Sequence, residues 1–242
     1  MIAFNLIFKK YYLLFIVFFN AFFIGMYFSG VALLQNIAAL NNDVFQYEHS
    51  REFGLLENAQ FFLLLYVICG LYVIAKKQIL EVKMVFLCAL ACFFFLLLEE
   101  IDYGIHFYRL LTDNFANSSN FNLHNNIDIG GKESTARLKA LLDLMNALWF
   151  VLIPLICCLL KRKMIIVPPL HFAAAFIVIL LFSKGAGLLN ELGYGIIDGV
   201  QGSLDGNISE FREFSNYYLY AVYIFYLIDV NFSSKKITDF FK

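Results

Sequence analysis

Three side chains suited to metal binding or proton transfer follow an apolar run of the sequence, at Glu99, Asp102 and His106. If the helix of that run continues, spacings of three and four residues place them along one helical face, which Arg109 extends. Carboxylate oxygens and an imidazole nitrogen in a poorly solvated place can bind a divalent metal or pass protons. The alternative is an internally satisfied network, in which Arg109 neutralises Asp102 and His106 bonds to a neighbouring loop.

The loop that follows contains a second polar group, at Asn122, His124 and Asn125. Asparagines are typical of turns and helix caps, which accounts for the two amides without a ligand. Histidine is also a common metal ligand and acid–base group. We therefore expect any cofactor to be a divalent metal, held by Glu99, His106 and His124.

A third polar group lies at the start of another apolar run, where Glu52, Glu57 and Asn58 occur close together. Glu57 is about one turn into that run, and an unpaired carboxylate in lipid costs several kcal/mol, so it needs a partner. Asp143 and Asn146 begin a further apolar run at comparable depth and can share a pocket with Glu57.

These groups define two sets of candidate residues. The candidate catalytic residues are Glu57, Glu99, Glu100 and His124. The expected supporting polar network consists of Glu52, Asn58, Asp102, Arg109, Asn122, Asn125, Asp143 and Asn146.

The elements that position these residues are apolar helices. Hydrophobic residues make up 61% of the 242-residue chain and charged residues only 15%, which is far more apolar than a soluble domain. A membrane span needs about 20 mostly apolar residues. The sequence therefore predicts an all-α bundle forming a single integral membrane domain over 1–242, with about six spans and two long outer loops. The predicted spans are 11–34, 53–75, 84–106, 141–160, 164–183 and 209–230, and the loops are 107–139 and 184–208.

The basic residues predict the orientation, because Lys and Arg in short connections stay on the cytoplasmic side. Most of them fall on one side of the predicted spans, which places both termini in the cytoplasm. They are Lys9, Lys10, Lys76, Lys77, Lys83, Lys161, Arg162, Lys163, Lys235, Lys236 and Lys242. Of the 19 acidic residues, only Glu81, Asp229 and Asp239 fall on that side, so the outer face is acidic. We expect an inner membrane protein of a bacterium.

Several protein classes are excluded or disfavoured. The five cysteines all fall within predicted spans, and an odd number there does not suggest a disulfide framework. No phosphate-binding glycine loop, zinc-finger spacing or basic nucleic-acid stripe occurs, so we expect no nucleic-acid partner. The glycine-rich segment 184–208 is either a lid over the outer pocket or an ordinary loop.

The polar motifs resemble an uncharacterised family of multipass membrane proteins. That family carries Glu-x-Gly-x-x-Glu at the start of its second span, then Glu-Glu-Ile-Ser-Trp-Gly-Gln-Arg, then Asn-Leu-His-Asn. Here the first motif is matched by Glu52–Glu57, the second in part by Glu99–Ile101 with Gly104, and the third completely by Asn122–Asn125. Asp102, Tyr103, Ile105 and His106 depart from the second motif.

This resemblance covers less than a third of the chain, and it implies a divergent member with a common membrane fold. It also implies a shared polar site built from Glu57, Glu99, Glu100 and His124. The family has no settled activity to carry over.

Three functions are compatible with these patterns. The first is a membrane-embedded enzyme acting at the outer leaflet on a lipid or lipid-linked substrate, with the candidate catalytic residues as metal ligands or acid–base groups. The second is a non-catalytic membrane subunit that docks a membrane protein partner through its acidic outer loops. The third is a cation transporter or channel component, in which the acidic face concentrates cations.

Overall fold

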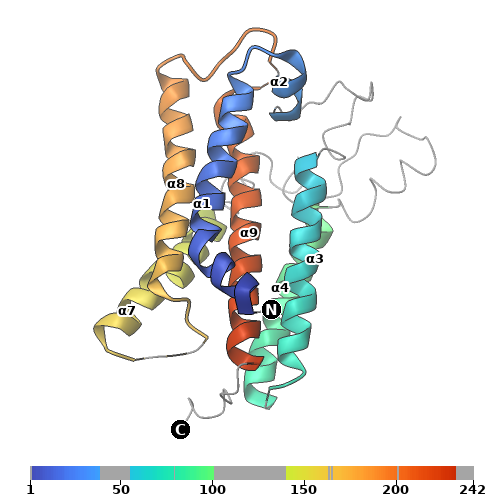
Figure 1. The fold of residues 1–242 in the computed structure, drawn as a ribbon, viewed down its shortest axis with the longest axis vertical. Helices are drawn as coiled ribbons and strands as arrows, with labels where there is room; N and C mark the ends of the chain where they lie inside the picture. Colours follow the sequence, from blue (N-terminus) through green and yellow to red (C-terminus); the bar gives the residue numbers. More distant parts are fainter. Residues whose placement is uncertain are drawn as a thin grey trace, which may run out of the picture. The chain divides into compact units, whose positions relative to one another are not determined.

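The computed structural model describes residues 2–38, 55–78, 80–100, 140–162, 164, 166–200 and 202–232. Within these ranges the regular elements are all helices, as composition predicts (Figure 1). They are α1 (Ile2–Tyr27), α2 (Ala32–Ala38), α3 (Leu55–Ala75), α4 (Leu80–Glu100), η5 (Leu148–Leu152), α7 (Ile153–Leu159), α8 (Leu170–Glu191) and α9 (Leu204–Phe232). Helical residues 140–147 run directly into η5.

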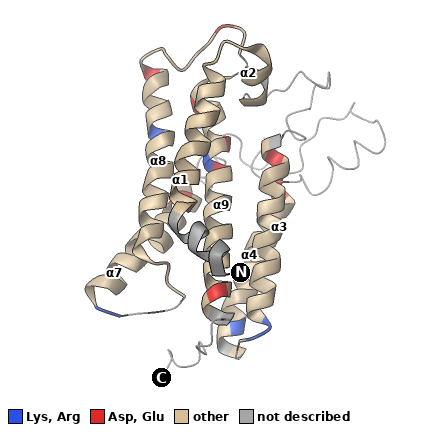
Figure 2. Cartoon of the chain, in the orientation of Figure 1, with Lys and Arg blue, Asp and Glu red and all other residues tan. Residues whose placement is uncertain are grey.

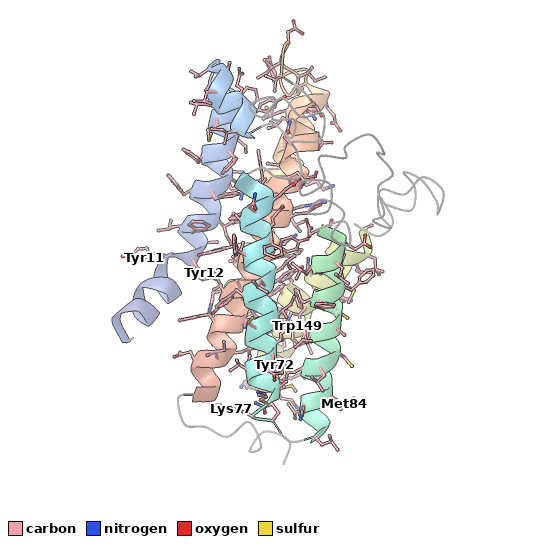
Figure 3. The ribbon with its side chains drawn as sticks, turned by 90° about the vertical axis from the view of Figure 1, so that its right-hand side faces the viewer. Tyr11, Tyr12, Tyr72, Lys77, Met84 and Trp149 are labelled. Carbon is pink, nitrogen blue, oxygen red and sulfur yellow. The ribbon has the colours of Figure 1, made fainter. Side chains whose placement is uncertain are left out.

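Among the residues that the structure describes, four helices are long and apolar enough to cross a membrane, which fits a multipass membrane protein. They are Leu56–Ala75, Val82–Glu100, Ala140–Leu159 and Leu170–Glu191. Figure 2 shows long stretches of helix without charge and basic residues gathered at the turn between α3 and α4. Lys76 lies over the ring of Tyr72 there, 4.5 Å from its centroid, and Lys77 follows it (Figure 3). All five cysteines are free thiols.

The start of α8 differs from the span predicted at 164–183. Pro168 and Pro169 immediately precede the helix, which begins at Leu170 and continues to Glu191. Proline is favoured just before or at the first helical position, because its missing N–H would have no intrahelical acceptor there. Hydropathy alone does not mark such a boundary, since the residues before the prolines are apolar as well.

The end of α8 is set by a glycine. The Tyr194 N–H donates to the Leu189 carbonyl at 2.9 Å, and Gly193 between them has a φ of 80°. This is the Schellman arrangement, which requires a left-handed residue that glycine adopts without strain. Because α9 already begins at Leu204, the glycine-rich connection is only residues 192–203.

The described helices group into two compact units. The first unit comprises Met1–Gln60 and Ala174–Leu219, and the second comprises Phe61–Ala173 and Tyr220–Lys242. The apolar core of the first unit forms where α1, α2, α8 and α9 meet. Its fully or nearly buried members are Phe23, Met26, Tyr27, Ala38, Ala186, Leu204, Ile208 and Phe211.

The second unit has an aromatic core. Phe150 stacks on Phe172 with ring centroids 6.1 Å apart, and both rings meet Tyr223 edge-on. The Tyr223 hydroxyl donates to the Ile166 carbonyl. Gly70 of α3 packs closely against α9, since a Cβ atom there would overlap the Cγ2 atom of Ile224.

A short π-helical stretch, η5, interrupts the helix Ala140–Leu159. In it the Ile153 N–H bonds to the Leu148 carbonyl, five residues back. Pro154 is the second residue after η5, and a proline inside a helix lacks an N–H and crowds the carbonyl four residues earlier. The widened turn relieves that conflict and lies beside the polar residue Asn146.

Candidate functional site

Four of the predicted candidates are described residues of the second unit. Glu99 and Glu100 are the last two residues of α4, where Glu99 is 6% exposed and Glu100 is half-buried. Asp143 and Asn146 lie one turn apart on the helix Ala140–Leu159, half-buried and buried respectively. Each of these positions adjoins a predominantly apolar span of its helix.

A tyrosine of α9 organises this part of the second unit. The Tyr220 hydroxyl donates to the Asn146 Oδ1 atom at 2.6 Å, and Asp143 interacts with Tyr220 electrostatically. The Tyr220 ring stacks on Phe150 and meets Phe93 edge-on, with centroids 6.0 and 5.2 Å away. Both α4 and the helix Ala140–Leu159 therefore pack against this one residue.

Helix geometry relates Glu100 to the tyrosine. Glu100 lies seven residues, or two turns, beyond Phe93 of α4, so the two share a face of the helix. That face is the one on which Phe93 contacts Tyr220. Glu100 thus lies about 10 Å further along the Tyr220-facing side of α4, at a rise of about 1.5 Å per residue.

Trp149 adds a further contact with α9 in the second unit. Its ring meets Tyr223 edge-on at 6.3 Å, and the two side chains are hydrogen-bonded. Trp149 belongs to the π-helical stretch η5, which directs it and Phe150 toward α9. Bulges of this type occur frequently at functional sites.

Two candidates lie in the first unit and the remainder lie outside the described residues. Glu57 is half-buried and Asn58 is exposed, both in the first turn of α3. The predicted candidates outside the described residues are Glu52, Asp102, His106, Arg109, Asn122, His124 and Asn125.

The metal-binding prediction depends largely on those undescribed residues. Of its three ligands, only Glu99 is described. Among the residues that the structure describes, no group of three His, Cys, Asp or Glu side chains is placed to hold a metal ion. The Glu99 carboxylate is nevertheless suited to metal binding or proton transfer, because a charge with little water around it interacts strongly with a nearby cation or proton donor.

Sequence reasoning missed the buried polar residues of the first unit. Asn20 donates to the Ser215 Oγ atom and to the Ile16 carbonyl, both at 2.9 Å. Gln60 is fully buried and donates to the Glu210 carbonyl at 3.3 Å. An amide inside an apolar run is itself a signal, because a buried polar group in lipid must find a partner.

Tyr220 gave no such signal. A tyrosine in an apolar run is expected at a membrane interface or in an aromatic core, so its residue type does not distinguish a polar role.

No family model, curated protein or solved structure matches this chain. The resemblance carried by Glu52–Glu57, Glu99–Ile101 and Asn122–Asn125 therefore stays a prediction.

Proposed function

We propose that this protein is a membrane-embedded enzyme whose acidic site faces the outer membrane surface and acts on a lipid or lipid-linked substrate. The observation that carries the proposal is Glu99, a carboxylate only 6% exposed in the last turn of an apolar helix. Such a residue in a membrane span is expensive to retain and marks a functional site by default. The Tyr220–Asn146 pair and Asp143 supply further polar groups in the same unit.

The proposed topology has six spans with both termini in the cytoplasm, in the inner membrane of a bacterium. Besides the four apolar helices, α1 and α9 contain 26 and 29 residues, and about 20 are enough for a crossing. The basic residues of the turn between α3 and α4 then lie inside, and Glu99 lies at the acidic outer face.

The proposed chemistry is hydrolysis or group transfer at a lipid headgroup or its linkage. Glu99 and Glu100 act as acid–base groups at the outer end of α4. Asn146, held by the Tyr220 hydroxyl, orients the polar end of the substrate. A divalent metal bound by Glu99, His106 and His124 would polarise the scissile bond.

Comparative lipid analysis tests this proposal. Membranes from cells that overproduce the wild type, Glu99→Gln or Glu191→Gln are extracted, and their lipids are compared by mass spectrometry. Glu191 is an exposed carboxylate at the end of α8, so its variant is the matched control. We expect a changed lipid species with the wild type and with Glu191→Gln, and its loss with a folded Glu99→Gln. Lipid profiles that do not differ between Glu99→Gln and the wild type would refute the proposal that this protein is an enzyme.

The second candidate function is a non-catalytic membrane subunit. It is favoured by the low coverage of two spans. Only 17% of the apolar stretch within Ala140–Leu159 and 22% of that within Val82–Glu100 is buried, against 39% of that within Leu56–Ala75. A weakly covered span has room for a helix of a partner.

Photocrosslinking tests directly whether the protein is a membrane subunit with a protein partner. A photoreactive residue at exposed Leu152 should yield one protein adduct of defined mass in membranes, whereas one at exposed Leu181 of α8 should yield only lipid adducts. Lipid adducts at both positions would count against a partner at Leu152.

A further inference from the structure

The connection between α8 and α9 is fixed by hydrogen bonds to the carbonyls of Gly195 and Gly202. The Gly195 carbonyl accepts from the Leu204 N–H at 2.7 Å and from the Tyr27 hydroxyl at 3.0 Å. The same hydroxyl lies 3.1 Å from the Gly202 carbonyl. These bonds hold residues 192–203 against the end of α1 (Figure 1).

Asn190 adds a further restraint. The surrounding donors and acceptors orient its amide so that its nitrogen donates to the Gly195 carbonyl at 3.1 Å and its oxygen accepts from the Asp205 N–H at 2.9 Å. It thereby satisfies one of the free N–H groups in the first turn of α9. The connection is a structured segment whose side chains have defined directions.

Despite these restraints, the segment turns large apolar side chains outward. Leu192, Tyr194 and Ile196 are 60%, 67% and 66% exposed, and Leu188 of the last turns of α8 is 57% exposed. We name these four residues the interfacial patch. Because Gly195 between two of them is held by its carbonyl, the patch cannot fold inward without breaking buried hydrogen bonds.

The interfacial patch continues the outward stripe of α8. Ile177, Leu181, Lys184 and Leu188 are all exposed and follow one another by three or four residues, so they lie on one helical face. In a span of this hydropathy that face meets lipid. Lys184 is the one charged residue of this stripe, and its long side chain can reach outward to the headgroups.

Helix length locates the patch relative to the bilayer. About 20 residues at about 1.5 Å each cover a hydrocarbon core of about 30 Å. Counted from Leu170, the core ends near Glu191, which is where the patch lies. Tyrosine is enriched at this level, because its ring is apolar and its hydroxyl is wet.

We propose that the interfacial patch is a lipid-binding surface, inserted at the boundary between the acyl chains and headgroups of the leaflet at the Tyr27 end of α1. Its partner is phospholipid, with the apolar side chains among the upper acyl chains and the Lys184 ammonium beside a phosphate. The connection between α8 and α9 is then a membrane-embedded element and not a solvated loop. This proposal is independent of any enzymatic activity.

Fluorescence quenching by brominated lipid tests the surface. Trp149 is the sole tryptophan of the chain, so Trp149→Phe provides a background for Tyr194→Trp and for Ile196→Trp. If that background does not fold, the Trp149 signal of the otherwise unchanged protein is subtracted instead. Each full-length variant is reconstituted in phosphatidylcholine–phosphatidylglycerol vesicles, with or without bromine on the upper part of the acyl chains. The matched control is Asp198→Trp, an exposed charged position in the same connection.

We expect emission at position 194 or 196 to be about twofold lower in brominated vesicles, as for a side chain at the interface. Emission at position 198 should instead be quenched by iodide added to the water. Bromine quenching at 194 and 196 that is no greater than at 198 would overturn the proposal and place the connection in water.

Discussion

In the first unit, polar side chains bond to backbone carbonyls near the ends of helices, whereas in the second unit aromatic rings pack round one hydroxyl–amide pair. Tyr27 shows the first arrangement, with its hydroxyl at the Gly195 and Gly202 carbonyls. Tyr220 shows the second, with its ring between Phe93 and Phe150 and its hydroxyl on Asn146. The same residue type therefore fixes a connection in one unit and joins three helices in the other.

The difference shows which groups are left for function. The Gly195 and Gly202 carbonyls belong to the connection between α8 and α9, and the Tyr27 hydroxyl already lies within hydrogen-bonding distance of both. In the second unit, Asn146 and Asp143 are side chains that interact with Tyr220, against which α4 also packs through Phe93. Side chains, unlike backbone carbonyls, can change their partners without unfolding a helix. We therefore expect substitutions in the first unit to affect stability and those at the polar side chains of the second unit to affect function as well.

The largest effect is expected at Gly70, where apolar packing in the second unit is closest. In Gly70→Leu the new side chain would overlap Ile224, so the free energy of unfolding should fall by about 3 kcal/mol. Gly25→Leu is the matched control, because no atom lies within 4 Å of a Cβ built there. Denaturation by SDS in mixed micelles, followed by circular dichroism, measures both. Equal losses in the two variants would contradict the close packing.

The next effect tests the fixed connection of the first unit. Tyr27→Phe removes the hydroxyl that lies at the Gly195 and Gly202 carbonyls and should lower the free energy of unfolding by about 1.5 kcal/mol, the upper end of the net contribution of one hydrogen bond. Tyr66→Phe, at an exposed tyrosine of α3, should be neutral in the same titration. A neutral Tyr27→Phe would mean that the hydroxyl does not hold the connection.

A smaller effect is expected for the polar pair of the second unit. Tyr220→Phe and Asn146→Leu should each cost about 1 kcal/mol, with a coupling free energy of similar size in the double variant. If Asn146 orients the substrate, the lipid product proposed above should fall in both single variants even where stability is retained. Additive losses of stability would show that the two side chains act separately.

The smallest effect is expected for the buried pair of the first unit. Asn20→Ala and Ser215→Ala should couple by about 0.6 kcal/mol, the typical size for hydrogen bonds between membrane helices. Neither substitution should change the lipid product. A coupling as large as that of Tyr220 with Asn146, or a change in the product, would remove the contrast between the two units.

Sequence reasoning identified several functional candidates but not their partners. The depth of Asp143 and Asn146 at the start of an apolar run predicts a polar position, and both are at least half-buried. The partner Tyr220 lies 74 residues away from Asn146 in the chain. The residues around it have the composition of an ordinary aromatic span. No local periodicity relates residues so far apart, so their contact could not be predicted.

The sequence by itself determined the class of this protein, because the hydrophobic effect acts on each residue separately and composition already reports its sum. It also determined which segments are apolar helices, since that follows from runs of neighbouring residues. Only the tertiary structure decided the pairing of Tyr220 with Asn146 and the outward direction of Tyr194. These depend on hydrogen bonds and contacts whose directions are fixed when distant segments pack together.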